Sequence, residues 1–97
     1  MPKPYESSTG TYTGTGVAQQ ITIGFKPNFI QILTFGLGDR GVKTNDIASD
    51  SYYNLITGAL STGGVTLNAL GFLLSPDGGL INALNILGET YYYTAVS

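Results

Sequence analysis

The stretch YYYTAV, at residues 91–96, places three consecutive tyrosines close to the C-terminus of a chain that has 97 residues and seven tyrosines. Side chains alternate between the two faces of a β-strand, so Tyr91, Tyr93 and Ala95 share one face. Tyr92 lies on the opposite face. We expect one face to pack into a core and the other to be exposed or to form an interface. If this strand is paired on both sides, the sheet holds the C-terminus in place, and Tyr91 and Tyr93 anchor the core.

Two stretches upstream also have the composition of β-strands. Residues 9–25, TGTYTGTGVAQQITIGF, are rich in Thr, and the apolar residues of their second half share one parity, which predicts a half-buried strand. Pro27 and Asn28 then supply a turn. Residues 29–36, FIQILTFG, are apolar on both parities, so we expect that strand to be covered on both faces.

The chain continues in short apolar segments separated by glycines: SYYNLITG, GVTLNAL and GFLLS, at residues 51–58, 64–70 and 71–75. Several short strands with turn signals at this spacing are typical of sandwiches and barrels. The sequence therefore predicts an all-β fold, a small antiparallel β-sandwich or a barrel-like variant. We expect a single domain over residues 9–97, preceded by a flexible N-terminal arm over residues 1–8.

One segment leaves helix and strand open. In SPDGGLINALNILGE, residues 75–89, three leucines and an alanine follow the i, i+3, i+4, i+7 spacing of a helix face, which allows one short helix near residues 80–87. That helix would be short, would contain two asparagines and would have strands on both sides. We therefore favour strand and turn.

The chain carries few charges and lacks cysteine and histidine. Four basic and six acidic side chains give a net charge of -2. Without Cys or His, thiolate and imidazole metal sites and the usual catalytic triads lose their commonest residues, so we expect no cofactor and no enzyme activity. Four basic residues are too few for a phosphate-binding surface, and no apolar stretch approaches the roughly 20 residues of a membrane-spanning helix. We therefore expect neither nucleic acid nor a membrane as a partner.

Low charge also bears on association. A small domain normally stays monomeric through a charged, mixed surface. This chain has a neutral, polar composition instead, so we expect it to associate with itself or with a permanent partner.

Two further patterns bear on binding. GLGDRG, at residues 36–41, matches the G-x-G-x-x-G of dinucleotide-binding proteins, but that fingerprint needs a helix directly after it, and the sequence that follows is a poor helix. Five of the ten charges fall within residues 39–50, which predicts a long exposed loop where binding is common. Tyrosine is enriched where proteins meet proteins or sugars. The candidate contact residues are therefore Tyr52, Tyr53 and Tyr92, with Asp39, Arg40 and Lys43.

Two parts of the chain carry a resemblance to a family. TYTGTGVAQQITIGFKPNFIQIL, residues 11–33, has Tyr, then Gly-x-Gly, then a Gly-Phe-x-Pro-Asn turn and an apolar strand. GFLLS and LNILGETYYYTAV, residues 71–75 and 84–96, add a Gly-Phe that opens a strand, an Asn before a Gly, and Tyr-x-Tyr before a small residue. Over roughly half its length the chain resembles a small β-domain found repeatedly in tailed-bacteriophage virion proteins. The matching positions are Tyr12, Gly14, Gly16, Gly24, Phe25, Pro27, Asn28, Gly71, Phe72, Asn85, Gly88, Tyr91, Tyr93 and Ala95.

Members of this family occur in tail-fibre, tail and head-associated proteins, so the resemblance implies a structural role in the virion. It implies turn and core roles, above all for Gly24, Phe25, Pro27, Asn85, Gly88, Tyr91 and Tyr93.

We therefore expect a non-enzymatic virion protein, a homo-oligomer that contacts other virion proteins on the particle surface as a capsid decoration or small tail component. A trimer is expected by analogy with the threefold symmetry common among phage fibres and decoration proteins. The N-terminus has no apolar signal-peptide core, so we expect synthesis in the host cytoplasm. The alternative is a carbohydrate- or host-receptor-binding module that binds a host-surface glycan through its exposed tyrosines and residues 39–50.

Overall fold

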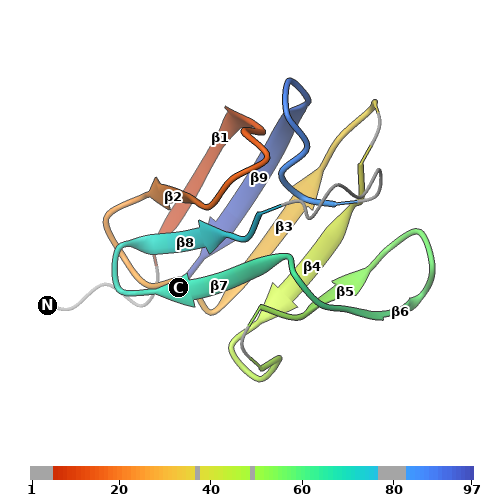
Figure 1. Ribbon diagram of the computed structural model, residues 1–97. Helices are drawn as coiled ribbons and strands as arrows, with labels where there is room; N and C mark the ends of the chain where they lie inside the picture. The colour runs from red at the N-terminus through yellow and green to blue at the C-terminus, as the bar shows by residue number, and fades with distance from the viewer. Residues whose placement is uncertain (1–5, 37, 49, 77–82) are drawn as a thin grey trace, which may run out of the picture.

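The computed structural model describes residues 6–36, 38–48, 50–76 and 83–97. Across these ranges the chain forms β-strands in two antiparallel sheets and no helix, which confirms the predicted all-β sandwich (Figure 1). The strands are β1 (Ser7–Thr13), β2 (Gln19–Thr22), β3 (Phe29–Leu33), β4 (Gly41–Thr44), β5 (Tyr52–Asn54), β6 (Ala59–Ser61), β7 (Val65–Asn68), β8 (Gly71–Leu74) and β9 (Thr90–Val96).

The larger sheet has six strands in the order β1-β9-β3-β4-β5-β6, and the smaller has three in the order β2-β8-β7. In Figure 1 the smaller sheet lies in front of the larger one, and its strands run across those behind. Strand β9 lies between β1 and β3 and pairs with both. The prediction that the C-terminal strand is a central element is therefore confirmed.

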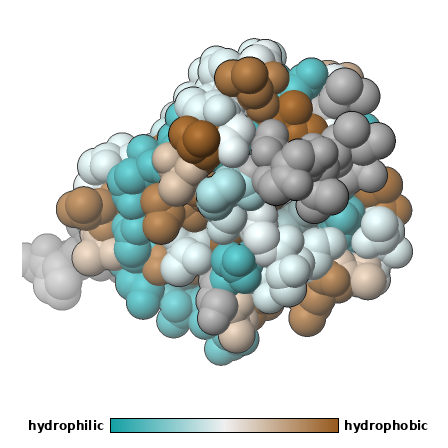
Figure 2. Space-filling view, viewed as in Figure 1, coloured by the Kyte–Doolittle hydropathy of each residue, from teal (hydrophilic) through white to brown (hydrophobic). Residues whose placement is uncertain are grey.

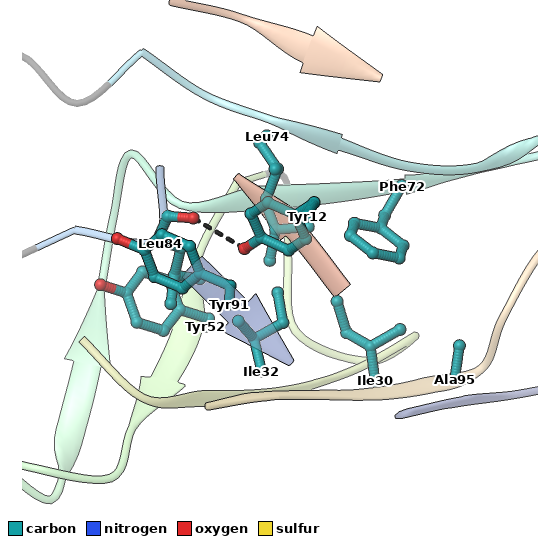
Figure 3. Packing of buried hydrophobic residues seen from close by; sticks show 10 residues of the cluster. Tyr12, Ile30, Ile32, Tyr52, Phe72, Leu74, Leu84, Tyr91 and Ala95 are labelled. Carbon is teal, nitrogen blue, oxygen red and sulfur yellow. Dashed lines mark hydrogen bonds between the residues drawn. The ribbon is translucent and has the colours of Figure 1, made fainter. Parts of the chain in front are cut away.

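The core fills the space between the two sheets (Figure 3). Tyr91 and Ala95 are fully buried on the inner face of β9, and Tyr93 packs against the same cluster, as the strand alternation predicts. Phe72 of the smaller sheet meets Tyr93 edge to face, with ring centroids 5.3 Å apart. Aromatic rings from both sheets therefore interlock, which gives a thin core a large buried apolar area.

Strand β3 differs from the prediction that both of its faces are covered. Ile30 and Ile32 are buried in the core, but Phe29 and Leu33 on the other face are only half-buried. The reason is that β3 belongs to the larger sheet, and the smaller sheet packs on only one side of it. The single chain therefore leaves apolar residues of β3 accessible.

The expected flexible N-terminal arm does not extend over residues 6–8. Strand β1 begins at Ser7, where it pairs with Val96. Just before it, the Glu6 amide donates to Ser97 Oγ (2.6 Å), and the Ser97 amide donates to the Glu6 carbonyl (2.8 Å). The boundary at residue 8 is therefore wrong, because pairing with β9 orders the chain from Glu6. Residues 1–5 lie outside the described residues.

Two other segments differ from the predicted secondary structure. Residues 9–25 do not form one strand, because β1 and β2 belong to different sheets and residues 14–18 connect them. Residues 83–87 form neither helix nor strand, only bends and the start of a turn. The rest of the predicted element, residues 80–82, lies outside the described residues.

Candidate interaction surface

The side of the six-stranded sheet that faces away from the core is here called the outer face. Its residues follow from the pairing register: Leu33 pairs with Tyr92, Val42 with Tyr53, and Tyr53 with Leu60. Because paired residues point to the same side of a sheet, the face can be traced from strand to strand. It consists of Ser7, Thr9, Thr11, Thr13, Phe29, Gln31, Leu33, Val42, Thr44, Tyr53, Leu60, Thr90, Tyr92, Thr94 and Val96.

None of these outer-face residues is charged. The charged side chains in the described ranges lie instead in turns and at strand ends, apart from Lys43, which is on a strand but buried. Large aromatic and aliphatic side chains are exposed on this side: Tyr92 is 45% exposed, Tyr53 43% and Leu60 64%. Exposed apolar groups that cluster without charge are typical of interaction sites, so the outer face is the best candidate on the molecule.

Phe35 extends the outer face beyond the end of β3. Its side chain is 84% exposed, and its ring lies 5.5 Å from that of Tyr92, centroid to centroid. An isolated monomer gains little from a phenylalanine in this position, because most of its apolar surface remains in water. The Phe35–Tyr92 pair therefore extends the candidate interaction surface at one end of the outer face.

The opposite side of the molecule has a different character. Figure 2 shows the side that carries the smaller sheet, where hydrophobic side chains form small separate groups among hydrophilic and neutral ones. Scattered apolar residues of this kind are normal on a protein surface. The comparison favours the outer face over the smaller sheet as the interaction surface.

Three candidate contact residues lie inside the molecule. The prediction of an exposed loop over residues 39–50 is wrong for Asp39 and Lys43, and Tyr52, which follows that loop, is buried as well. Asp39, Lys43 and Tyr52 are each only about 2% exposed. The chain there contains β4, whose alternation directs Lys43 inward. Arg40, Tyr53 and Tyr92 are exposed, and Tyr53 and Tyr92 share the outer face.

Asp39 accepts two hydrogen bonds on one carboxylate oxygen. Tyr52 Oη and Asn54 Nδ2 donate to Asp39 Oδ2 at 2.5 and 2.9 Å, while Asp39 Oδ1 is buried with no hydrogen-bond partner among the described residues. Burial, and next the hydrogen bond to the Asp39 carboxylate, raise the pKa of Tyr52 above its ordinary value. Asp39 therefore holds β5 against the start of β4 instead of presenting a charge to a partner.

Lys43 organises the loop between β4 and β5. Its ammonium donates to the carbonyls of Ile47 (2.9 Å), Ala48 (3.4 Å) and Ser51 (2.6 Å). Burial lowers the pKa of Lys43, and the negative charge of Asp50 partly opposes this effect. A cavity of about 150 Å³ lies beside it, lined by Lys43, Asn45, Ile47, Ala48, Thr66 and Leu67. Because carbonyls already occupy the ammonium donors, the lysine has a structural role here.

A polar cluster at one end of the core fixes residues 83–86. Tyr12 Oη donates to the Leu84 carbonyl (2.7 Å), and Tyr91 Oη donates to the Ala83 carbonyl (2.9 Å). In Figure 3 these hydroxyls point to the same end of the core, where Leu84 lies. A segment without regular structure must satisfy its backbone groups in another way, and the tyrosines do so here.

The side chain of Asn85 completes this cluster. Its Oδ1 accepts from the Thr15 amide (2.9 Å), and its Nδ2 donates to the carbonyls of Val17 (2.6 Å) and Ser75 (3.1 Å). Gly14 lies so close to the Ile86 carbonyl that any side chain there would collide with it. Asn85 thus joins the β1–β2 connection to the end of β8, and Gly14 permits the close approach.

Sequence patterns missed part of the outer face, namely Phe35, Leu60, Leu33 and Val42. In the sequence, this face corresponds to uncharged residues at every second position of each strand. These positions form one surface only when the register between the strands is known.

In the ranges that the structure describes, no three Asp or Glu side chains gather as a metal site, and no helix could span a membrane. Comparisons of the chain with protein-family models, with curated proteins and with solved structures found no match.

Proposed function

We propose that the chain is a non-enzymatic structural protein of a tailed-phage virion, a homo-oligomer on the particle surface that acts as a capsid decoration or small tail component. The observation that carries the proposal is the uncharged outer face. Seven of its residues are aromatic or aliphatic, and they are distributed over five of the six strands: Phe29, Leu33, Val42, Tyr53, Leu60, Tyr92 and Val96. A protein that works alone in solution has little use for such a face, whereas a subunit of an assembly can bury it.

The resemblance to the phage domain supports the virion role in this proposal. Several of the matching residues lie at positions where the fold requires that residue type. Tyr12 and Tyr91 bond residues 83–86, Asn85 joins three segments, and Gly24 and Gly88 have positive φ angles of 90° and 84°. Left-handed backbone of this kind favours glycine. The resemblance therefore concerns residues that specify the architecture of this chain, and the virion role is inferred from the resemblance.

Mass spectrometry of purified particles tests the proposal. The chain should be present in stoichiometric amounts, at a copy number that matches a symmetric position on the head or tail. Particles that lack the chain, from a culture that expresses it, would contradict a virion role.

A carbohydrate- or receptor-binding module is the second candidate. Tyr53 and Tyr92 offer exposed rings for sugar stacking, and Phe35 lies beside Tyr92. The burial of Asp39 and Lys43 removes two of the polar groups that this candidate would use beside them. A glycan array probed with the purified protein separates the candidates, because binding that is lost in Tyr92→Ala would favour the module.

A further inference from the structure

Within the described part of the chain, strand β1 forms one end of the six-stranded sheet and pairs only with β9. Two hydrogen bonds at its ends fix which residues face β9: the Ser97 amide donates to the Glu6 carbonyl, and the Gly14 amide donates to the Glu89 carbonyl. In an antiparallel pair every second residue bonds to the neighbouring strand. The even-numbered residues of β1 therefore bond to β9, and the amides and carbonyls of Ser7, Thr9 and Thr11 point away from the sheet.

This edge lacks the features that normally protect an edge strand. Proteins block exposed edges with charges, proline, bulges or very short strands. Strand β1 has seven residues, SSTGTYT, with no charge and no proline, whereas the opposite edge strand β6 has three. Near its end, the Thr13 carbonyl accepts from Gln19 Nε2 (3.2 Å), so Ser7–Thr11 is the part of the edge left open by the residues that the structure describes.

We propose that β1 pairs antiparallel with β1 of a second copy of the chain, around a twofold axis that places Thr9 opposite Thr9 of the partner subunit. The same register places Ser7 opposite Thr11 of the partner subunit. All three residues then donate one backbone hydrogen bond and accept another, so the open donors and acceptors of the edge are satisfied together. Two six-stranded sheets become one continuous sheet.

A second copy fits this edge better than an unrelated chain. The twofold axis places Thr9 opposite its own copy, so a charge at or beside the axis would be repelled by its counterpart, and β1 carries no charge. The outward side chains next to the axis are threonines and serine, which form favourable cross-strand pairs. The pairing also makes the two outer faces continuous. It stands independently of the virion proposal, because it uses only the edge of β1.

Amide hydrogen exchange, followed by NMR at low and high protein concentration, tests the pairing. The amides of Ser8 and Gly10 bond to β9 and should be protected at both concentrations. The Thr9 and Thr11 amides should exchange freely in the dilute monomer and about tenfold or more slowly at a concentration where light scattering gives a dimer.

The variant Thr9→Pro provides a second test of the pairing. Proline is tolerated on an edge strand where its nitrogen faces solvent, so the variant removes one edge donor and leaves the bonds to β9. Thr9→Val is the matched control, because it keeps the amide. We expect the proline variant to be a monomer with a cooperative melting transition, and the valine variant to dimerise like the wild type.

Two results would overturn the pairing: a monomer at millimolar concentration, or an oligomer in which the Thr9 and Thr11 amides exchange equally fast at all concentrations. The second result would assign association to another surface and leave the virion proposal standing. If Thr9→Pro does not fold, the exchange experiment on the wild type still decides.

Discussion

The rings of Tyr12 and Tyr91 stack with centroids 5.0 Å apart and planes 10° from parallel, and the two residues are direct cross-strand partners in β1 and β9. Their hydroxyls donate to the adjacent carbonyls of Leu84 and Ala83. One aromatic pair thus packs the core and also holds the irregular segment that precedes β9. The link explains how tyrosines near the C-terminus contribute to the centre of the fold.

Removing one of these hydroxyls should destabilise the protein without changing its shape. Tyr91 Oη donates to the Ala83 carbonyl and accepts from the Ile86 amide (3.0 Å). Tyr91→Phe leaves both groups without this partner, so we expect a loss of about 1–3 kcal/mol in the free energy of unfolding, measured with urea. Tyr92→Phe is the control, since its exposed hydroxyl should matter by no more than about 0.5 kcal/mol. Equal stability of the two variants would contradict the structural role of the Tyr91 hydroxyl.

Deleting residues 91–97 should abolish folding. Strand β9 pairs with β1 on one side and β3 on the other, so the deletion separates β1 from the rest of its sheet. The loss of buried Tyr91 alone corresponds to about 3–5 kcal/mol, against a total stability of about 5–15 kcal/mol for a domain. Far-ultraviolet circular dichroism should show no β-sheet signal. A soluble deletion variant with an unchanged melting curve would show that β9 is peripheral.

The ring of Tyr52 lies between two glycines, which gives a steric prediction. A Cβ at Gly41 would lie 2.5 Å from Tyr52 Cδ2, and a Cβ at Gly64 would collide with the opposite ring edge at Cδ1. We expect Gly64→Ala to cost about 1–3 kcal/mol through overpacking, measured by thermal or urea unfolding. Gly36→Ala is a suitable control, because the three atoms nearest to the added methyl all belong to the end of the Glu89 side chain, which can move. A fully stable Gly64→Ala would mean that the Tyr52 ring has room to shift.

Alkaline conditions should unfold the protein through its buried tyrosines. Burial raises the pKa of Tyr12 and Tyr52 above the ordinary value of 10.0. The folded state therefore holds these protons at a pH where the unfolded chain releases them. The stability is fully present below pH 10.0 and falls above it, by up to about 1.4 kcal/mol per pH unit for each group. Urea unfolding from pH 9 to 11.5 measures the slope.

Single variants separate the tyrosines in that experiment. Tyr52→Phe should lower stability at neutral pH, because Asp39 loses a donor, but should reduce the slope above pH 10.0. Tyr53→Phe removes an exposed hydroxyl and should keep the wild-type slope. The same slope in both variants would exclude Tyr52 as a source of the alkaline loss.

The sequence predicted the fold where strand periodicity is sufficient and failed where the hydrogen-bond partners of a residue decide its position. Alternation around Tyr91 and Tyr93 identified the inner face of β9, because strand periodicity is a local property. The burial of Lys43 could not be predicted in this way, since its partners are backbone carbonyls of the loop from Ile47 to Ser51. The five charges within residues 39–50 indicated an exposed segment, because lysine side chains are usually exposed.

Two other differences have similar causes. The apolar residues of 80–87 have the spacing of a helix. In the described part of this segment, however, the Tyr12 hydroxyl bonds to the Leu84 carbonyl and the Tyr91 hydroxyl bonds to the Ala83 carbonyl, and the backbone there is not helical. These tyrosine partners could not be predicted from the spacing. The apolar residues on both parities of β3 indicated two covered faces, and the single chain covers one. If a partner subunit covers the other, the pattern reflects the assembly instead of the monomer.

The outer face gives the last prediction, which concerns self-association. Light scattering of the wild-type protein at micromolar concentration should give a multiple of the 10.2 kDa chain mass. Leu60→Lys and Tyr92→Lys each place a charge on the outer face without disturbing the core, so each should shift the mass toward that of the monomer if this face is buried between subunits. Val17→Lys is the matched control, because Val17 is also an exposed apolar residue but precedes β2, away from the outer face. A wild-type mass of 10.2 kDa at this concentration would remove the argument that the outer face forms a stable homo-oligomer, and the pairing through β1 would then be decided at millimolar concentration. An oligomer that resists both lysine variants but dissociates in Thr9→Pro would assign assembly to the edge of β1 alone, and the outer face would then remain free for another virion protein.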